Sequence, residues 1–164
     1  MIDLNKVKTV LFDFDETLCV HEGHTTDVDN AAHIANFLEC GMRHYDKRKK
    51  NAQMAEFIDL CVERGIEVGV ISACSSSIEM EAKCQWAAEV YKHPFKNCCV
   101  DTAEHKIFML EALSRVHAVW KSEIAIVDDL IFTVSRAADA GFTAWTPMEV
   151  VNYVNCYLPP ERRD

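Results

Sequence analysis

The stretch that decides the fold is Val10–Leu18, Val-Leu-Phe-Asp-Phe-Asp-Glu-Thr-Leu, in which an apolar run leads into two carboxylates. Side chains two residues apart in a strand point the same way, so Asp13 and Asp15 should converge just beyond a buried strand. Two such carboxylates repel each other unless a cation or a shared proton lies between them. The arrangement suits Mg²⁺, which prefers oxygen ligands, or a carboxylate nucleophile that accepts a phosphoryl group.

Outward from this stretch, short apolar segments alternate with segments of helical periodicity. We expect strands at 8–12, 66–71, 123–127 and 142–145, a short strand at 98–100, and helices at 27–43, 52–64, 78–91, 103–118, 130–140 and from Pro147 onward. Strands that alternate with helices indicate a parallel sheet with helical crossovers. The nearly continuous apolar strands indicate burial on both faces. The expected fold class is therefore α/β.

Length and charge narrow the class of protein further. A chain of 164 residues is predicted to form a single domain, 1–164. A net charge of -9 argues against broad binding to nucleic acid or to an anionic membrane. We find no signal peptide, no apolar run long enough to span a bilayer and no Cys-x2-Cys pair among the eight cysteines. We therefore expect a cytoplasmic protein with reduced thiols and no membrane partner.

Polar residues recur directly after the predicted strands. Ser72 follows the strand at 66–71, and Asp128 and Asp129 follow the strand at 123–127. The carboxyl ends of parallel strands lie at one edge of the sheet, so these residues are predicted to meet the Asp-x-Asp pair in one crevice. Taken singly, Ser72 has an alternative as a helix cap, and the acidic pair has an alternative as a turn.

Together these motifs resemble those of the haloacid dehalogenase (HAD) superfamily of phosphohydrolases, over most of the chain from Lys8 to about Trp145. The four matching segments are Asp13-Phe14-Asp15-Glu16-Thr17, Val70-Ile71-Ser72, Lys106 within Glu104-His105-Lys106, and Ile126-Val127-Asp128-Asp129. The resemblance implies a three-layer Rossmann-like sheet with a small helical cap insertion. It also implies a Mg²⁺-dependent phosphatase.

The resemblance also implies roles for the matched residues. Asp13 would attack phosphorus and carry the phosphoryl group, and Asp15 would protonate the leaving oxygen and then activate water. Ser72 and the backbone amide of Ala73 would hold the phosphoryl oxygens, while Lys106 would neutralise Asp13 and the phosphate.

The implied metal site takes its ligands from two of the motifs. Mg²⁺ would bind a carboxylate oxygen of Asp13, the backbone carbonyl of Asp15 and the carboxylate of Asp129, with Asp128 behind it. The chain departs from the family pattern twice: Glu16 replaces a commoner glycine, and Phe132-Thr133 stands where many relatives have a further Asp or Asn. The second departure predicts looser binding of Mg²⁺, although Thr133 could bind a metal-bound water.

Residues 19–50 are the predicted small cap insertion. So small a cap would leave the crevice open, which favours a macromolecular phosphoester or a substrate covered by a second subunit of a homo-oligomer. A nucleotide, a polynucleotide end and a phosphoprotein remain open, with nucleic acid only as a substrate. Within the cap, Cys19, His21 and His24 would bind a soft metal or line the entrance, and the basic run Lys47–Lys50 would steer phosphates or form a solvated loop.

A second function from a different class is a regulatory module that keeps the fold and binds a phosphorylated ligand without turnover. The intact set of Asp13, Asp15, Ser72, Lys106 and Asp129 favours the enzyme, since a binding module has no chemical need for both carboxylates of the first motif. Sequence alone does not separate hydrolysis from phosphoryl transfer to another acceptor.

Overall fold

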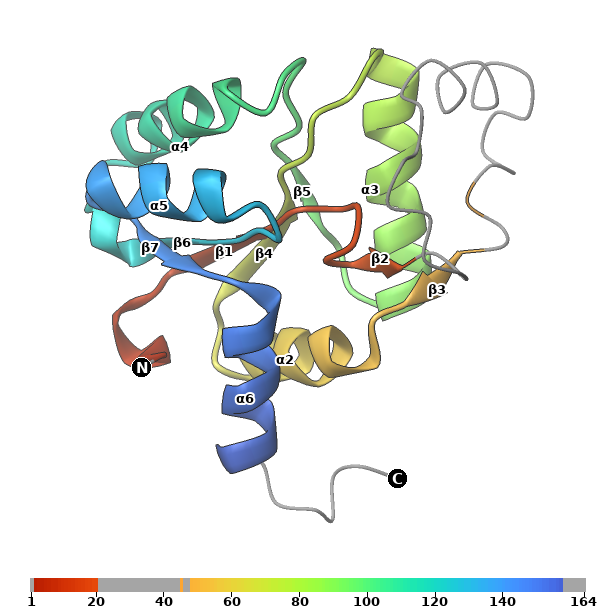
Figure 1. The fold of residues 1–164 in the computed structure, drawn as a ribbon, viewed down its shortest axis with the longest axis horizontal. Helices are drawn as coiled ribbons and strands as arrows, with labels where there is room; N and C mark the ends of the chain where they lie inside the picture. Colours follow the sequence, from red (N-terminus) through yellow and green to blue (C-terminus); the bar gives the residue numbers. More distant parts are fainter. Residues whose placement is uncertain (1, 21–44, 46–47, 158–164) are drawn as a thin grey trace.

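A five-stranded parallel sheet forms the centre of the protein (Figure 1). The computed structural model describes residues 2–20, 45 and 48–157. In spatial order the strands are β5 (Lys96–Asn97), β4 (Glu67–Val70), β1 (Thr9–Phe12), β6 (Ile124–Val127) and β7 (Thr143–Trp145). The chain moves from β1 to β4 and β5, then crosses back to β6 and β7. The predicted parallel α/β sheet is confirmed, and the winding direction changes between β1 and β6, the place where such sheets bind ligands.

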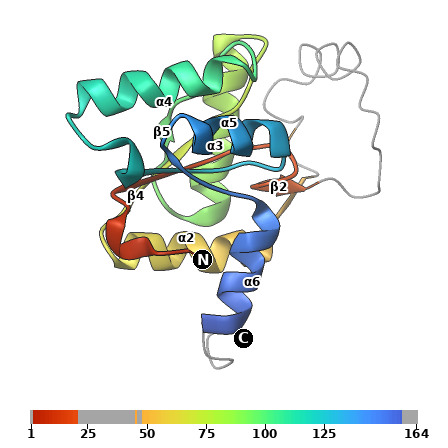
Figure 2. The ribbon, with the colours of Figure 1, turned by 60° about the vertical axis from the view of Figure 1, so that its left-hand side comes forward.

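Helices cover both faces of this sheet, which gives three layers (Figures 1 and 2). The helices are α2 (Ala52–Glu63), α3 (Ser77–Tyr91), α4 (His105–Val116), α5 (Ile131–Asp139) and α6 (Pro147–Tyr157), with 3-10 turns η1 (Leu4–Lys6) and η3 (Lys121–Glu123). Helices α4 and α5 pack on one face, and α2, α3 and α6 supply the core of the other. Within the described residues, no helix combines the length and the apolar character needed to cross a bilayer.

The two cores show why the strands are apolar without interruption. Val10 and Phe12 of β1 pack on the side of α2, whereas Leu11 between them packs on the side of α4 and α5. In the same way, Val127 of β6 faces the first core and Ile126 the second. Because successive side chains of a strand point to opposite faces, a strand covered on both faces needs an apolar residue at every position.

The register of the central strands brings their carboxyl ends to one level. Phe12 of β1 is paired with Val70 of β4 and with Val127 of β6. Beyond the strands, the Asp13 amide donates to the Val127 carbonyl at 2.8 Å, and the Ile71 amide donates to the Phe12 carbonyl at 2.8 Å. The polar residues that follow the three strands therefore emerge at the same edge of the sheet.

The predicted insertion 19–50 begins and ends in an antiparallel ribbon of β2 (Cys19–Val20) and β3 (Lys49–Lys50). The Tyr91 hydroxyl of α3 ties its base together, since it donates to the Leu18 carbonyl at 2.6 Å and accepts from the Asn51 amide at 3.1 Å. The predictions for His21, His24, Lys47, the helix at 27–43 and the body of the cap lie outside the described residues. The short strand expected at 98–100 lies instead at β5, and Val100 forms only an isolated bridge to Ala73.

A tight turn separates the Asp-x-Asp pair from β2. The Glu16 amide donates to the Cys19 carbonyl at 2.9 Å, and Glu16 adopts a φ of 56°. This left-handed conformation costs a residue with a Cβ atom roughly 1–2 kcal/mol, and glycine adopts it readily. The backbone thus explains why glycine is the commoner residue at this position of the motif.

We predict that Glu16→Gly gives a free energy of unfolding about 1 kcal/mol higher than Glu16→Ala, because only glycine relieves the left-handed strain. Both variants remove the same charge, so their difference isolates the backbone term. Urea denaturation of the two proteins provides the measurement. An alanine variant as stable as the glycine variant would contradict the prediction.

Candidate active site

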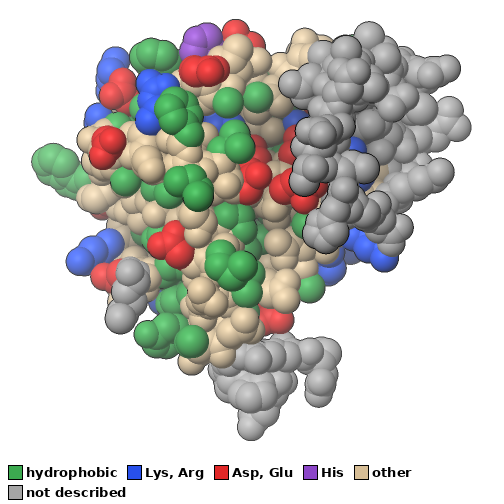
Figure 3. All heavy atoms as spheres, viewed as in Figure 1, with side chains coloured by type: hydrophobic (Ala, Val, Ile, Leu, Met, Phe, Trp, Pro, Cys, Tyr) green, Lys and Arg blue, Asp and Glu red, His purple; other side chains and the backbone are tan. Residues whose placement is uncertain are grey.

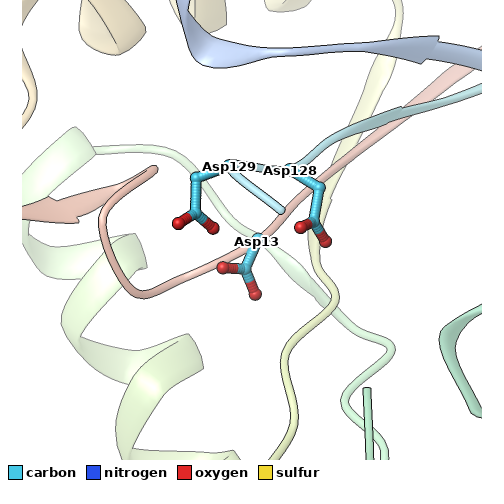
Figure 4. A group of neighbouring side chains, drawn as sticks. All are labelled: Asp13, Asp128 and Asp129. Carbon is cyan, nitrogen blue, oxygen red and sulfur yellow. The ribbon is translucent and has the colours of Figure 1, made fainter. Parts of the chain in front are cut away.

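Three carboxylates converge where β1 and β6 end (Figure 4). Ligand oxygens of Asp13, Asp128 and Asp129 all lie within 4.8 Å of one another. In the part of the chain that the structure describes, no other group of three His, Cys, Asp or Glu side chains is as close. On the face drawn in Figure 3, acidic side chains gather over this edge of the sheet. A set of three hard oxygen donors fits Mg²⁺ better than a soft metal.

Lys106 from the first turn of α4 joins two of these acids. Its ammonium donates to Asp13 Oδ1 and to Asp128 Oδ2, each at 2.7 Å. The lysine and both acids are buried. Burial of Lys106 opposes its charge, but the two carboxylates outweigh this effect and raise its pKa above the ordinary value. The predicted contact between Lys106 and Asp13 is therefore present, and it extends to Asp128.

One cation does not balance the negative charge of this group. Burial raises the pKa of Asp13 to about 7, and repulsion from Asp128 and Asp15 adds to the effect while Lys106 opposes it. Partial desolvation and repulsion from Asp128 also raise the pKa of Asp129, although its side chain reaches solvent. A divalent cation at this edge would favour the ionised form of both groups.

The two members of the acidic pair have different surroundings. Asp128 is fully buried, and its second oxygen, Oδ1, accepts a hydrogen bond from the Leu130 amide at 2.9 Å. Both of its oxygens therefore already have protein partners, one of them at the start of α5. Asp129 is exposed to solvent at the mouth of the site. Asp129 is therefore the more available of the two as a metal ligand, whereas Asp128 anchors Lys106 and the start of α5.

Ser72 and Ala73 follow β4 beside this group. Ser72 is buried, and its carbonyl accepts from the Val100 amide at 2.9 Å, while the Cys74 amide donates to the Val100 carbonyl at 2.8 Å. These two hydrogen bonds use the carbonyl of Ser72 and the amide of Cys74, so the amide of Ala73 takes no part in them. A hydroxyl and a backbone amide at this place are donors suited to a phosphoryl oxygen.

Asp15 is held by Lys83, a residue that was not among those predicted from the sequence. Its Oδ2 accepts from the ammonium of Lys83 in α3 at 2.7 Å, and the same ammonium donates to Ser72 Oγ at 3.0 Å. Lys83 is 1% exposed. A signal was present in the sequence, because Lys83 and Glu79 share the helical face of Ala82 and Trp86, which all turn inward. A charged pair on an apolar helical face indicates a buried polar network.

Two further residues named from the sequence, Thr133 and Cys19, are both buried. Phe132 is exposed on α5, whereas Thr133 is buried. Burial raises the pKa of the Cys19 thiol to about 12, which disfavours the thiolate that a soft metal needs. His21 and His24, the other members of that trio, are among the residues that the structure does not describe.

We predict that, without metal, Asp13→Asn gains stability over the wild type as the pH rises. The pKa of Asp13 is about 7 in the folded protein against an ordinary 3.8, so between these values the folded state binds the extra proton. The wild-type free energy of unfolding must then fall across this window as the pH rises, whereas asparagine does not titrate. Urea denaturation in EDTA at about pH 5 and about pH 8 measures the difference. A difference that does not change with pH would contradict the assignment.

Comparisons with known proteins agree with this fold. No family model and no curated protein sequence matches the chain. A hypothetical protein from Xanthomonas campestris has a similar structure, with 14% identity over 87% of this chain and 65% of that one and a TM-score of 0.54. The cobalt-bound deoxy-D-mannose-octulosonate 8-phosphate phosphatase of Haemophilus influenzae is similar with 16% identity over 91% of this chain and 75% of that one and a TM-score of 0.52. A HAD-family enzyme of Bacteroides thetaiotaomicron in its magnesium complex is similar with 13% identity over 87% of this chain and 93% of that one and a TM-score of 0.53. The chain thus spans 65% of the length of the Xanthomonas protein. At these identities the likeness shows the fold, which is the HAD-like fold.

Proposed function

We propose that the protein is a Mg²⁺-dependent phosphomonoester hydrolase that acts through an aspartyl-phosphate on Asp13. One observation carries the proposal: the buried ammonium of Lys106 bridges Asp13 and Asp128 beside the exposed Asp129, at the point where the sheet reverses its winding. One of the similar structures is named as a phosphatase and another as a HAD-family enzyme in its magnesium complex, and both names support the same class of reaction.

In the first step, a carboxylate oxygen of Asp13 attacks phosphorus and the bond from phosphorus to the leaving oxygen breaks. Asp15 gives its proton to that oxygen, so the product leaves as an alcohol. In the second step, Asp15 takes a proton from water as the water oxygen attacks phosphorus. The bond between phosphorus and Asp13 then breaks, which releases phosphate and restores both carboxyl groups to their starting state.

Three groups would hold the transferred phosphoryl group. The Ser72 hydroxyl and the Ala73 amide donate hydrogen bonds to its oxygens from the β4 side, and Lys106 offers positive charge from the side of Asp13. Their donors are in place before substrate arrives, because Ser72 and Lys106 are both buried. Such preorganisation lowers the cost of developing charge in phosphoryl transfer.

The proposed ligands for Mg²⁺ are the carboxylates of Asp13 and Asp129 and the backbone carbonyl of Asp15. Asp128 orients the site through its bonds to Lys106 and to the Leu130 amide. When bound, Mg²⁺ screens the repulsion between the carboxylates and the phosphate. The substrate we propose is a small or macromolecular phosphomonoester that enters an open crevice, with residues 19–50 as a small cap.

The test is hydrolysis of p-nitrophenyl phosphate by the wild type, by Asp13→Asn and by Asp139→Asn, each with Mg²⁺ and with EDTA. We expect activity that requires the metal and a loss of at least about a thousandfold in kcat/KM for Asp13→Asn, since the nucleophile is removed. Asp139 is an exposed acid in α5, so Asp139→Asn is a matched control that should retain activity.

A metal-independent activity, or an Asp13→Asn variant as active as the wild type, would contradict the mechanism. A wild type that binds Mg²⁺ and inorganic phosphate but turns over none of a panel of phosphomonoesters would favour the binding module.

A further inference from the structure

Lys83 is a buried cation with a complete set of partners. Its ammonium donates to Asp15 Oδ2 at 2.7 Å, to Ser72 Oγ at 3.0 Å and to the Ala73 carbonyl at 3.2 Å. An ammonium carries three protons, so these three acceptors use all of them. The Lys83 side chain is 1% exposed, and a buried charge is stable only with such partners. This one residue therefore connects the first and second motifs of the proposed site.

Helix α3 holds Lys83 in a fixed position. The helix begins after Ser76, whose hydroxyl accepts from the Glu79 amide at 3.2 Å, while Glu79 Oε2 accepts from the Ser75 amide at 2.7 Å. The other oxygen of Glu79 lies 3.4 Å from the Lys83 ammonium, and the ring of Phe14 lies 5.3 Å from it. Burial of Lys83 opposes its charge, but the attraction and hydrogen bond of Asp15 act together with other neighbouring groups and raise the pKa of Lys83.

Asp15 needs this anchor more than Asp13 does. The Asp15 side chain is 39% exposed, whereas that of Asp13 is 8% exposed. An exposed side chain can change rotamer, and a hydrogen bond to Oδ2 from a rigid buried ammonium restricts that freedom, whether Oδ1 is ionised or protonated. Because the ammonium occupies Oδ2, the proton that Asp15 must carry as an acid is left to Oδ1.

The contact with Ser72 has a similar effect. Its hydroxyl accepts from Lys83, and the hydrogen bond that it donates within the described residues goes to the Ala73 carbonyl at 3.5 Å, a weak contact. The hydroxyl proton of Ser72 therefore stays available for a phosphoryl oxygen. The Lys83 ammonium has no lone pair with which to accept a hydrogen bond, and all three of its protons are donated to protein acceptors. It therefore acts through Asp15 and Ser72 rather than on the substrate.

We infer that Lys83 is a positioning residue that fixes Asp15 for proton transfer to the leaving group and turns the Ser72 hydroxyl toward the phosphoryl group. The inference rests on the proposed phosphatase function. It assigns Lys83 and Lys106 separate tasks: Lys106 serves the nucleophile Asp13, and Lys83 serves the acid Asp15.

The test compares kcat/KM for phenyl phosphate and p-nitrophenyl phosphate, with Mg²⁺, in the wild type and in Lys83→Met. Phenolate needs a proton as it leaves, whereas p-nitrophenolate is a stable anion that needs little assistance. Misplacing the acid should therefore lower kcat/KM about a hundredfold for phenyl phosphate and about tenfold or less for p-nitrophenyl phosphate. Equal losses on both esters would overturn the role of Lys83, because a merely structural defect does not depend on the leaving group.

Lys92→Met is the matched control. It makes the same substitution at an exposed lysine at the end of α3, so the ratio between the two esters should equal that of the wild type. If Lys83→Met fails to fold, the double variant Glu79→Gln with Lys83→Met removes both buried charges, and the same ratio is measured in it. A wild-type ratio in the folded double variant would also overturn the inference.

The two proposals fail in distinguishable ways. A wild type that hydrolyses neither ester overturns the phosphatase function and the role of Lys83 with it. An active wild type whose Lys83→Met variant keeps the ratio of the two esters overturns only the role of Lys83.

Discussion

The ion pair of Lys106 with Asp13 and Asp128 is the interaction on which the rest of the site depends. All three side chains are buried, and buried charges are stable only when they are paired and hydrogen-bonded. Loss of one partner from such a group typically costs about 3–5 kcal/mol, because the remaining charge is left without compensation. The pair also joins β1, β6 and α4, so the same contact that concentrates negative charge at the sheet edge holds that edge together.

The winding of the sheet decides which helices reach this edge. Helix α3 lies in the layer with α2 and α6, and α4 lies in the opposite layer with α5. The two buried lysines therefore approach the Asp-x-Asp pair from different helices, Lys83 toward Asp15 and Lys106 toward Asp13. Two carboxylates that lie two residues apart in sequence thus have separate cations, which is a basis for separate chemical roles.

The helices and the central strands could be predicted because their patterns are local. Helix α2 begins at Ala52 as expected, and β6 ends at Val127 directly before the acidic pair. The edge strand β5 was placed too late in the chain, because the apolar residues at 98–100 that suggested a strand are buried without forming a ladder. Edge strands carry little pattern of their own, since their pairing is decided by the neighbouring strand.

The sequence alone determined the α/β class and the carboxylates after β1 and β6, because residue spacing and strand ends follow from covalent geometry. The lysine at the start of α4 was indicated by the resemblance to the HAD family. The tertiary structure decided what those residues touch. It buried Asp128 in contact with the Leu130 amide and left Asp129 at the surface, although the two are neighbours in sequence. It also brought Lys83 to Asp15 across 68 positions of the chain. The apolar face of α3 indicates that Lys83 is buried, but the identity of its partner depends on how α3 packs against the sheet.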